Sequence, residues 1–326
     1  MKAVWYDRQG PANEVLQYSE QPTPEAGAGE VRIKLEASGV NPADCARRGG
    51  AGFPQDFPLI ITNSDGAGIV DQVGKGVPER WLGKRVWLYN GQRFRPFGTA
   101  AETIALNVDL VTELPDGIDM AAGATLGIPC MTAHRAVFLA APVQGITILV
   151  TGGAGAVANY AIQLAKWAGA NVIATVSSLQ KAKIAKEAGA DHVIDYKKED
   201  VAARVMEFTG GVDHIVEVDF GGNLATSLKV LKMNGSLAFY ASRGNPSPTV
   251  AAGGLVRLNA TVHAMSLPTS PLASRQRAQR DITSWLKSGR ARLHVAAKFP
   301  LRDTVAAHQA VEKGDKLGTV VVEPHR

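Results

Sequence analysis

The residues best suited to chemistry in this sequence form the run G-A-G-A-V-A that begins at Gly153. Its spacing fits the G-x-G-x-x-G/A pattern of a dinucleotide-binding loop. Gly153 suits the tight turn after a strand, Gly155 lets a pyrophosphate approach the backbone, and Ala158 allows close packing of the next helix. Ala156 and Val157 open that helix, whose free N–H groups attract phosphates. The pattern predicts a dinucleotide site; a glycine-rich turn without a ligand is the alternative.

The second strand of the same unit indicates which dinucleotide is bound. NAD sites place Asp or Glu at the end of this strand, where it bonds the ribose 2′-hydroxyl. Here the strand ends A-T-V-S-S, and Lys181 follows three residues after Ser178. Ser177 and Ser178 can donate hydrogen bonds to a 2′-phosphate and Lys181 adds positive charge. We therefore predict NADPH over NADH, although Ser178 equally suits a helix N-cap and Lys181 a solvated helix face.

Strands and helices alternate at short spacing from about residue 121 to 265, which predicts the scaffold of this site. We expect strands at 146–151, 171–176, 192–196, 212–218, 236–242 and 256–265, helices at 156–168, 179–189, 199–208 and 223–235, and a loop at 243–254. This alternation is typical of a parallel sheet covered on both faces. Right-handed crossovers make it a doubly wound α/β (Rossmann) domain.

The chain before residue 120 has a different pattern, rich in predicted strands and poor in helical periodicity. Alternating or glycine-punctuated strands are expected at 30–40, 65–74 and 83–89. The tail after residue 266 predicts a basic helix at 274–289, a strand, a helix near 303–313 and a final strand, and is too short for a domain. We therefore predict a β-rich domain from residues 1–120 and 266–326, and a cofactor domain from residues 121–265.

Composition excludes several other classes of protein. The 326 residues carry a net charge of +5, and the basic residues are dispersed, so nucleic-acid binding is not expected. Only two cysteines occur, outside any C-x-x-C pair, which disfavours a zinc ribbon or disulfide framework. No run resembles a signal peptide or a membrane span of about 18 apolar residues. A cytoplasmic location without membrane contact is expected.

Several motifs occur in the order of a known family. They are M-K-A-V, A-S-G-V-N-P-A-D, L-G-I-P-C-M-T-A-H-R-A, the glycine loop with A-I-Q-L-A-K, G-A-D-H-V-I-D-Y-K-K-E-D, A-S-R-G and L-G-T-V-V-V. Over nearly its whole length the sequence resembles the zinc-independent quinone oxidoreductases, the zeta-crystallin group of the medium-chain dehydrogenase/reductase superfamily. The resemblance implies a GroES-like catalytic domain, an active site in the cleft between the domains, and a homodimer or tetramer.

The resemblance also implies roles for individual residues. Asn41 would lie near the nicotinamide and substrate, and Thr132 near the nicotinamide end. The pyrophosphate would lie at Gly153, Gly155, Ala156 and Val157, and the 2′-phosphate at Ser177 and Lys181. Tyr196 would lie near the adenosine, and Ser242 and Arg243 along the cofactor. Each has an alternative: Asn41 shapes the turn before its proline, Thr132 caps a helix, Tyr196 is an exposed strand end, and Arg243 is a loop charge.

Zinc relatives place ligands in G-x-C-x-x-D and G-H-E stretches, which here read G-V-N-P-A-D and N-S-D. Asn41 replaces the cysteine, and Asp65 alone cannot supply the three ligands of a catalytic zinc. Cys130 and His134 lie in another segment, so we expect no metal. Cys45 has no activating His or Lys beside it in the sequence and is expected to be a packing residue.

Without zinc the protein suits acceptors that are already electrophilic. We predict an NADPH:quinone oxidoreductase in which Asn41 bonds the developing oxyanion and water supplies the final proton. Members of this family often carry tyrosines just after G-V-N-P, and here Ala46 and Gly52 take their places. Tyr89 is therefore the second catalytic candidate, together with Asn90, and Phe53 and Arg95 are weaker candidates. The alternative for Tyr89 is an aromatic residue that packs at a strand end. An enone or alkenal double-bond reductase, and an NADPH-binding protein without turnover, are the alternatives.

Overall fold

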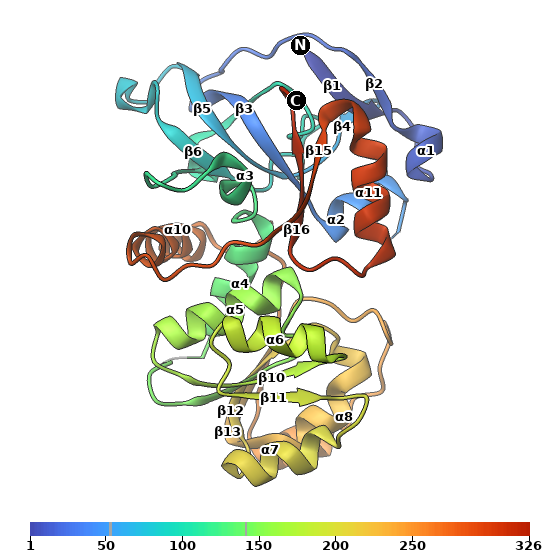
Figure 1. The fold of residues 1–326 in the computed structure, drawn as a ribbon, viewed down its shortest axis with the longest axis vertical. Helices are drawn as coiled ribbons and strands as arrows, with labels where there is room; N and C mark the ends of the chain where they lie inside the picture. The colour runs from blue at the N-terminus through green and yellow to red at the C-terminus, as the bar shows by residue number, and fades with distance from the viewer. Residues whose placement is uncertain (52–53, 141) are drawn as a thin grey trace. The chain divides into compact units, whose positions relative to one another are not determined.

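The chain divides into two compact units. The computed structural model describes residues 1–51, 54–140 and 142–326, coloured along the chain in Figure 1. The first unit comprises Met1–Ile128 and Leu293–Arg326, and the second Pro129–Arg292. None of the helices in the described part of the chain combines the length and apolar character that a membrane span requires.

The second unit is built on a six-stranded parallel sheet with the order β11-β10-β9-β12-β13-β14. Its strands are β9 (Thr147–Val150), β10 (Asn171–Val176), β11 (His192–Asp195), β12 (Val212–Glu217), β13 (Leu231–Phe239) and β14 (Thr261–Ala264). The central strand β9 is buried along its whole length, as a strand covered on both faces must be. The order reverses at β9, which confirms the doubly wound Rossmann fold predicted from the alternating pattern.

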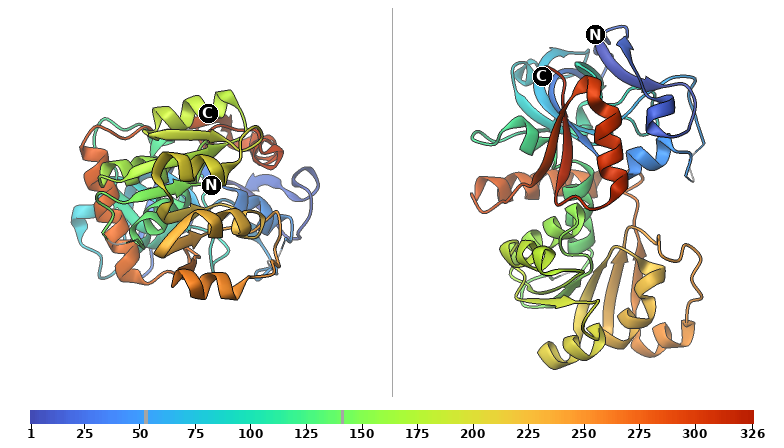
Figure 2. Two further views of the ribbon diagram at one scale, coloured as in Figure 1. Left: turned by 90° about the horizontal axis from the view of Figure 1, so that it is seen from below. Right: turned by 45° about the vertical axis from the view of Figure 1, so that its right-hand side comes forward.

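Helices cover both faces of this sheet (Figure 2). They are α5 (Ala156–Trp167), α6 (Leu179–Glu187), α7 (Val201–Thr209), α8 (Phe220–Val230) and α9 (Ala252–Leu258). Two further helices, α4 (Ile128–Phe138) and α10 (Leu272–Lys287), lie before and after this series in the chain. Val205 of α7 and Leu224 of α8 share one apolar cluster with the sheet residues Leu149 and Ile215, which places these two helices on a common face. The parallel strands therefore all end at one edge, where a cofactor site is expected.

The first unit is a β-rich domain. Its larger sheet has the order β15-β16-β3-β5-β6-β8, with β7 also paired to β3, and a smaller sheet has the order β2-β1-β4. The strands are β1 (Lys2–Tyr6), β2 (Gln17–Glu20), β3 (Glu30–Val40), β4 (Ile60–Ile61), β5 (Asp65–Val73), β6 (Arg85–Leu88), β7 (Thr103–Asn107), β8 (Val111–Glu113), β15 (Val295–Pro300) and β16 (Thr319–Glu323). Alternate residues of β3, including Ile33 and Leu35, enter the core with Val86 and Leu88.

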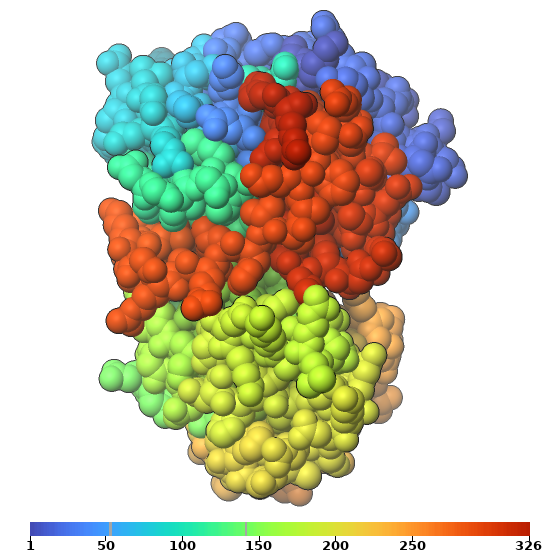
Figure 3. Space-filling view, viewed as in Figure 1, coloured from blue at the N-terminus to red at the C-terminus, as the bar shows by residue number. Residues whose placement is uncertain are grey.

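The C-terminal segment completes this domain, as the sequence predicted for its last strands. The unit's helices are α1 (Ala12–Val15), α2 (Pro42–Arg48), α3 (Met120–Gly123) and α11 (Thr304–Lys313), with short 3₁₀ turns η1 (Glu79–Trp81), η2 (Val108–Leu110) and η3 (Leu301–Asp303). Val320 pairs with Val40, and Ala307 and Val311 pack with Val4 in one core. Figure 3 shows the red atoms of this segment packed beside the blue atoms of the N-terminal one.

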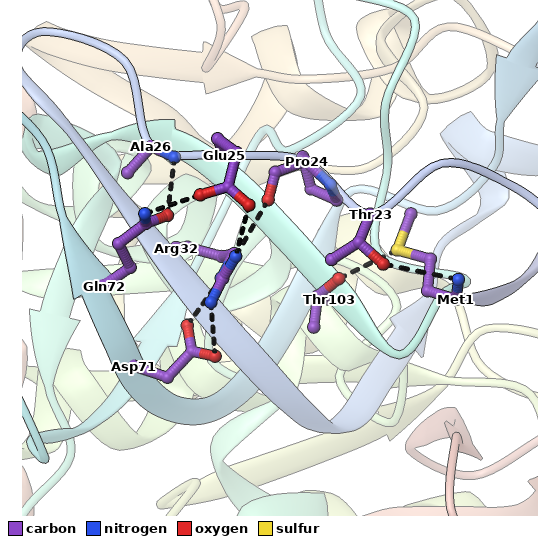
Figure 4. Close-up of polar contacts among 9 residues, drawn as sticks. All are labelled: Met1, Thr23, Pro24, Glu25, Ala26, Arg32, Asp71, Gln72 and Thr103. Carbon is purple, nitrogen blue, oxygen red and sulfur yellow. Dashed lines mark hydrogen bonds and ion pairs between the residues drawn. The ribbon is translucent and has the colours of Figure 1, made fainter.

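A network on the surface of the first unit anchors the connection before β3 (Figure 4). Arg32 of β3 donates to both carboxylate oxygens of Asp71 on β5, at 3.0 and 3.2 Å, and to Glu25 at 3.1 Å. Gln72 accepts from the N–H of Ala26 at 2.9 Å. These bonds hold an otherwise irregular segment against the sheet.

Two predicted elements differ from those observed. The helix expected to reach residue 235 ends at Val230, and β13 begins at Leu231. Leu231 of β13 pairs with Val212 of β12, and the next pair in register is Ser236 with His214. The residues between Leu231 and Ser236 form a bulge at the predicted turn, and Asn234 within it has φ +62°. The strand expected over 256–265 is instead α9 followed by β14, because Asn259 takes the left-handed conformation (φ +48°) that ends the helix.

The two units also divide at places other than residues 120 and 265. The basic helix α10, expected with the β-rich domain, belongs to the second unit. Its apolar side includes Trp285, which meets Tyr160 of α5 edge to face at 6.1 Å between ring centroids. Its Asp281 lies 2.9 Å from His134 of α4. A buried tryptophan and this polar contact attach α10 to α4 and α5.

Candidate active site

The loop between β9 and α5 contains three glycines whose backbone conformation and surroundings differ. Gly152 has the left-handed φ of +68°, and Gly153 lies within the turn that the Gly155 N–H closes on the Gly152 carbonyl at 2.8 Å. Gly153 is small because a Cβ there would lie 2.9 Å from the Cβ of Ala174 and 3.2 Å from Ile162. Gly155 is the N-cap of α5, and a Cβ there would meet only the carbonyl of Gly152, at 3.3 Å. Gly153 thus lies in the tight turn, as predicted, and the open space above Gly155 suits a phosphate.

Hydrogen bonds to neighbouring strands hold this loop in place. Gly153 N–H donates to the carbonyl of Thr175 at 2.8 Å. Thr151 donates to Glu217 Oε1 at 2.8 Å and accepts from the N–H of Val218 at 2.9 Å. Burial raises the pKa of Glu217, a carboxyl at the end of β12 that the sequence argument did not single out. Because Gly155 has no side chain to cap α5, the first N–H groups of the helix, at Ala156 and Val157, stay available to an anion.

The residues predicted for a 2′-phosphate meet at the ends of β10 and β11. Lys181 Nζ lies 3.1 Å from Ser177 Oγ. Ser178 caps α6 by accepting from the Lys181 N–H at 3.3 Å, so the capping alternative for Ser178 is the one observed. Tyr196 follows β11 and is 51% exposed. Asp195, the register partner of Val176, accepts from the N–H of Lys197 in its own turn.

The loop after β13 is fixed to the start of α8. Ser242 Oγ accepts from the Gly221 N–H at 3.0 Å and donates to the Asn245 carbonyl at 2.6 Å. Asp219 accepts from the Gly244 N–H at 3.0 Å. Arg243 lies between two residues that these bonds hold, Ser242 and Gly244, in the loop that follows β13. Ser242 acts in this structure as a loop anchor.

Thr132 lies inside α4 and is buried, so it is not the cap of that helix. The capping alternative raised from the sequence is therefore wrong. The neighbouring side chains Cys130 and His134 are buried as well. A hydroxyl within a helix remains a possible hydrogen-bond donor to a ligand.

In the first unit, Asn41 is held between two buried carboxyls. It is the N-cap residue of α2, and its N–H donates to Asp44 Oδ2 at 2.8 Å. Its side-chain Nδ2 donates to Asp65 Oδ2 at 2.7 Å. Ser64 donates to the other oxygen of Asp44 at 2.6 Å. Asn41 therefore does more than shape a turn: its amide has one defined orientation.

Cys45 lies next to a histidine, which the sequence did not predict. Its Sγ lies 3.5 Å from Nδ1 of His308, a residue of α11, and Nε2 of His308 lies 2.9 Å from Asn63 Oδ1. Burial raises the pKa of Cys45 to about 12 and lowers the pKa of His308 to about 3. Both groups are thus neutral near pH 7, and the thiol packs the core rather than attacking a substrate.

The second catalytic candidate, Tyr89, is fully buried. Its hydroxyl lies 3.4 Å from the carbonyl of Asp109, within the same unit. The position is that of a packing aromatic at the end of β6, and we do not retain it as a catalytic residue. Asn90 is also buried, and Arg95 bonds the carbonyl of Ala105. Phe53 lies outside the described residues.

Comparisons with known proteins agree with this architecture. Residues 27–116 match the alcohol dehydrogenase GroES-like domain, and residues 156–282 match the zinc-binding dehydrogenase family. The chain is 31% identical to a quinone oxidoreductase of Pseudomonas aeruginosa over 95% of its own length and 96% of that protein. The chain belongs to the quinone oxidoreductase family of the medium-chain dehydrogenase/reductase superfamily. It is therefore an oxidoreductase with a Rossmann domain and a GroES-like domain.

Two further members of the superfamily bear on the chemistry. A mycobacterial protein solved in complex with NADPH superposes with a TM-score of 0.87 at 31% identity, covering 99% of this chain and all of that one. A 2-haloacrylate reductase of Burkholderia sp. is 28% identical over 99% of both chains. The relatives thus include a quinone oxidoreductase and a 2-haloacrylate reductase.

The residues of this oxidoreductase do not fit the zinc that one matched family is described as binding. Asn41 faces Asp65 with an N–H group, which cannot bind a cation. Within the described ranges no three His, Cys, Asp or Glu side chains come together as ligands. A catalytic zinc takes about three such ligands, and we derive no step through a metal.

Proposed function

We propose that this oxidoreductase transfers a hydride from NADPH to a quinone. The observation that carries the choice of cofactor is the pair formed by Lys181 and Ser177 at the end of β10, 3.1 Å apart. A cation and a hydroxyl together suit a 2′-phosphate. The nearby carboxylate, Asp195 at the end of β11, accepts a hydrogen bond from the Lys197 N–H within its own turn. The similar protein solved with NADPH supports the same choice.

In this proposal the second unit binds the cofactor and the first binds the acceptor. The N–H groups of Ala156 and Val157 bind the pyrophosphate above Gly155, and Tyr196 lies at the adenosine end. Thr132 and Arg243 contact the cofactor elsewhere along its length. When bound, NADPH supplies the hydride.

Asn41 acts on the acceptor. Its amide has two N–H groups, and only one donates to Asp65. The second can donate to the acceptor oxygen as negative charge develops there. We also propose that the protein is a homodimer, as the resemblance predicts, and light scattering of the purified protein measures this.

Absorbance of the reduced nicotinamide tests the function directly. Purified protein is given NADPH or NADH with a panel of quinones and a panel of enones. We expect NADPH to be consumed with quinones at a much higher kcat/KM than NADH. Equal use of both cofactors would overturn the interpretation of Ser177 and Lys181.

An enone reductase is the second candidate, supported by the likeness to the 2-haloacrylate reductase. Both reactions add a hydride to a carbon conjugated with an oxygen-bearing group, so the same Asn41 serves either. Consumption of NADPH with enones alone would move the function to double-bond reduction and leave the cofactor assignment unchanged.

The Lys181→Ala variant isolates the 2′-phosphate contact. Losing one charge-assisted hydrogen bond costs about 1.5–3 kcal/mol, so we expect the preference for NADPH over NADH to fall at least tenfold. Lys183→Ala is the matched control, because Lys183 lies on the same helix with a side chain that is 79% exposed. A control variant that loses as much preference would show that general charge, rather than this contact, selects the cofactor.

A further inference from the structure

One carboxylate oxygen in the first unit accepts two hydrogen bonds from different parts of the fold. Asp65 Oδ2 lies 2.7 Å from Nδ2 of Asn41 and 2.7 Å from the backbone N of Ile128. Ile128 begins α4, the helix that carries Thr132 one turn later. The same atom therefore connects the loop before α2 with the start of α4.

The surroundings leave this carboxylate little freedom to move. Asp65 is completely buried, and its own carbonyl accepts from Thr99 Oγ1 at 2.7 Å. A Cβ on Gly127 would lie 2.2 Å from the Asp65 carboxyl carbon, so the glycine is what makes room for the carboxyl. The group is packed in one position.

Burying the Asp65 carboxyl lowers the free energy of unfolding, so we look for a function that the carboxyl serves. Asp65 is completely buried, and taking a carboxyl group out of water costs free energy even where hydrogen bonds satisfy it. Burial, followed by the charge of Asp44, raises the pKa of Asp65 well above its usual range. A chain that needed only packing here would be more stable with an apolar side chain.

We propose that Asp65 is a positioning residue that fixes the amide of Asn41 for the reaction. An Asn side chain presents an acceptor on one side and a donor on the other, and either can be turned toward a neighbour. Oδ2 of Asp65 accepts from the Ile128 N–H, so a proton held by this carboxyl lies on Oδ1 and Oδ2 stays an acceptor, which requires the NH₂ side of Asn41 to face it. The direction of the second N–H of Asn41 is then set before any acceptor arrives.

This inference rests on the proposed function, because it assigns a task to Asn41 in that reaction. It predicts that the loss at Asp65 appears in kcat rather than in KM or in NADPH affinity. A misplaced catalytic group can reduce a rate by roughly 100-fold. We expect kcat of Asp65→Ala to fall 10- to 100-fold, with KM changed less than about threefold.

A double-mutant cycle of Asp65→Ala and Asn41→Ala, assayed with NADPH and the best quinone, tests the proposal. If Asp65 acts through Asn41, the double variant is no slower than Asn41→Ala alone. Asp65→Asn keeps an acceptor oxygen in place and should recover most of the lost kcat. Thr99→Val is the structural control, since it removes a buried hydrogen bond to Asp65 but leaves the carboxyl and Asn41 intact, and it should keep wild-type kcat.

The outcomes separate the two proposals. A folded Asp65→Ala with wild-type kcat, or losses that multiply in the double variant, would overturn the role of Asp65 while Asn41→Ala remained slow. An Asn41→Ala with full activity would instead remove Asn41 from the proposed mechanism. If Asp65→Ala does not fold, Asp65→Leu gives the same test, because an apolar side chain fills the buried space and accepts no hydrogen bond from Asn41.

Discussion

Replacing Gly155 by alanine is the sharpest test of where the pyrophosphate binds. The added Cβ meets only the Gly152 carbonyl, at 3.3 Å, and the backbone there has φ −71°, which alanine adopts freely. We therefore expect the free energy of unfolding to change by no more than about 0.5 kcal/mol. The methyl group does occupy the space through which a phosphate reaches the first N–H groups of α5. Losing one charge-assisted bond of about 1.5–3 kcal/mol weakens NADPH binding roughly 10- to 100-fold.

Gly153→Ala is the matched variant, because it adds the same methyl group two residues earlier with the opposite consequence. Its Cβ would lie 2.9 Å from the Cβ of Ala174, 3.2 Å from Ile162 and 3.3 Å from Ala185. Overpacking of this kind costs about 1–3 kcal/mol. A unit of this size loses roughly 2–4 °C in Tm for each kcal/mol.

Calorimetric titration with NADPH and thermal unfolding of both variants separate these effects. Gly155→Ala should bind NADPH weakly with an unchanged Tm, and Gly153→Ala should show a lowered Tm. Wild-type NADPH affinity in a folded Gly155→Ala would refute the placement of the pyrophosphate above this residue. A large loss of Tm in that variant would show that Gly155, too, is required for packing.

Three further results are expected. Burial lowers the pKa of His308 to about 3 and the pKa of His214 to about 4, so the unfolded chain binds more protons than the folded one below pH 6.5. The free energy of unfolding should therefore fall by about 2 kcal/mol per histidine between pH 6.5 and pH 5. Denaturant unfolding at the two pH values measures this change. Unchanged stability over that range would contradict their burial as neutral groups. Cys45, with its pKa raised to about 12, should resist iodoacetamide at pH 8 until the protein is unfolded, as mass spectrometry can show; rapid labelling of the native protein would contradict this. Ser178→Ala should cost about 0.5–2 kcal/mol of stability and leave cofactor preference unchanged, whereas a lost preference would give Ser178 a phosphate contact.

Most of the fold could be predicted because its elements are locally encoded. The buried strand β9, the glycine loop and α5 follow from apolar runs, small residues and helical spacing that lie next to one another in the chain. The errors occurred where local preference gave way to packing. Lys232–Gly235 bulges out of β13 because the strand must pair with β12 on either side of it. The start of α9 carries glycines that gave no helical signal.

The candidate site was predictable to different degrees in the two units. In the second unit the spacing of the loop and the end of β10 predicted Gly155, Ser177 and Lys181 as cofactor contacts, because all three lie within five residues of a strand end, and these contacts stay predictions. Glu217 was missed, since its contact with Thr151 joins strands 66 residues apart in sequence. Tyr89 was suggested as a substitute for the missing family tyrosines, and only its burial showed that it packs the core as a strand-end aromatic.

The sequence by itself determined the doubly wound sheet, the glycine loop and the absence of an acid at the end of its second strand, because these are properties of neighbouring residues. Only the tertiary structure decided which side chains meet across long separations. It brought His308 to Cys45 over 263 residues and Asp65 to Asn41 over 24. Such pairs depend on burial and on the register of distant strands, and those determine whether a thiol is inert and which way an amide faces.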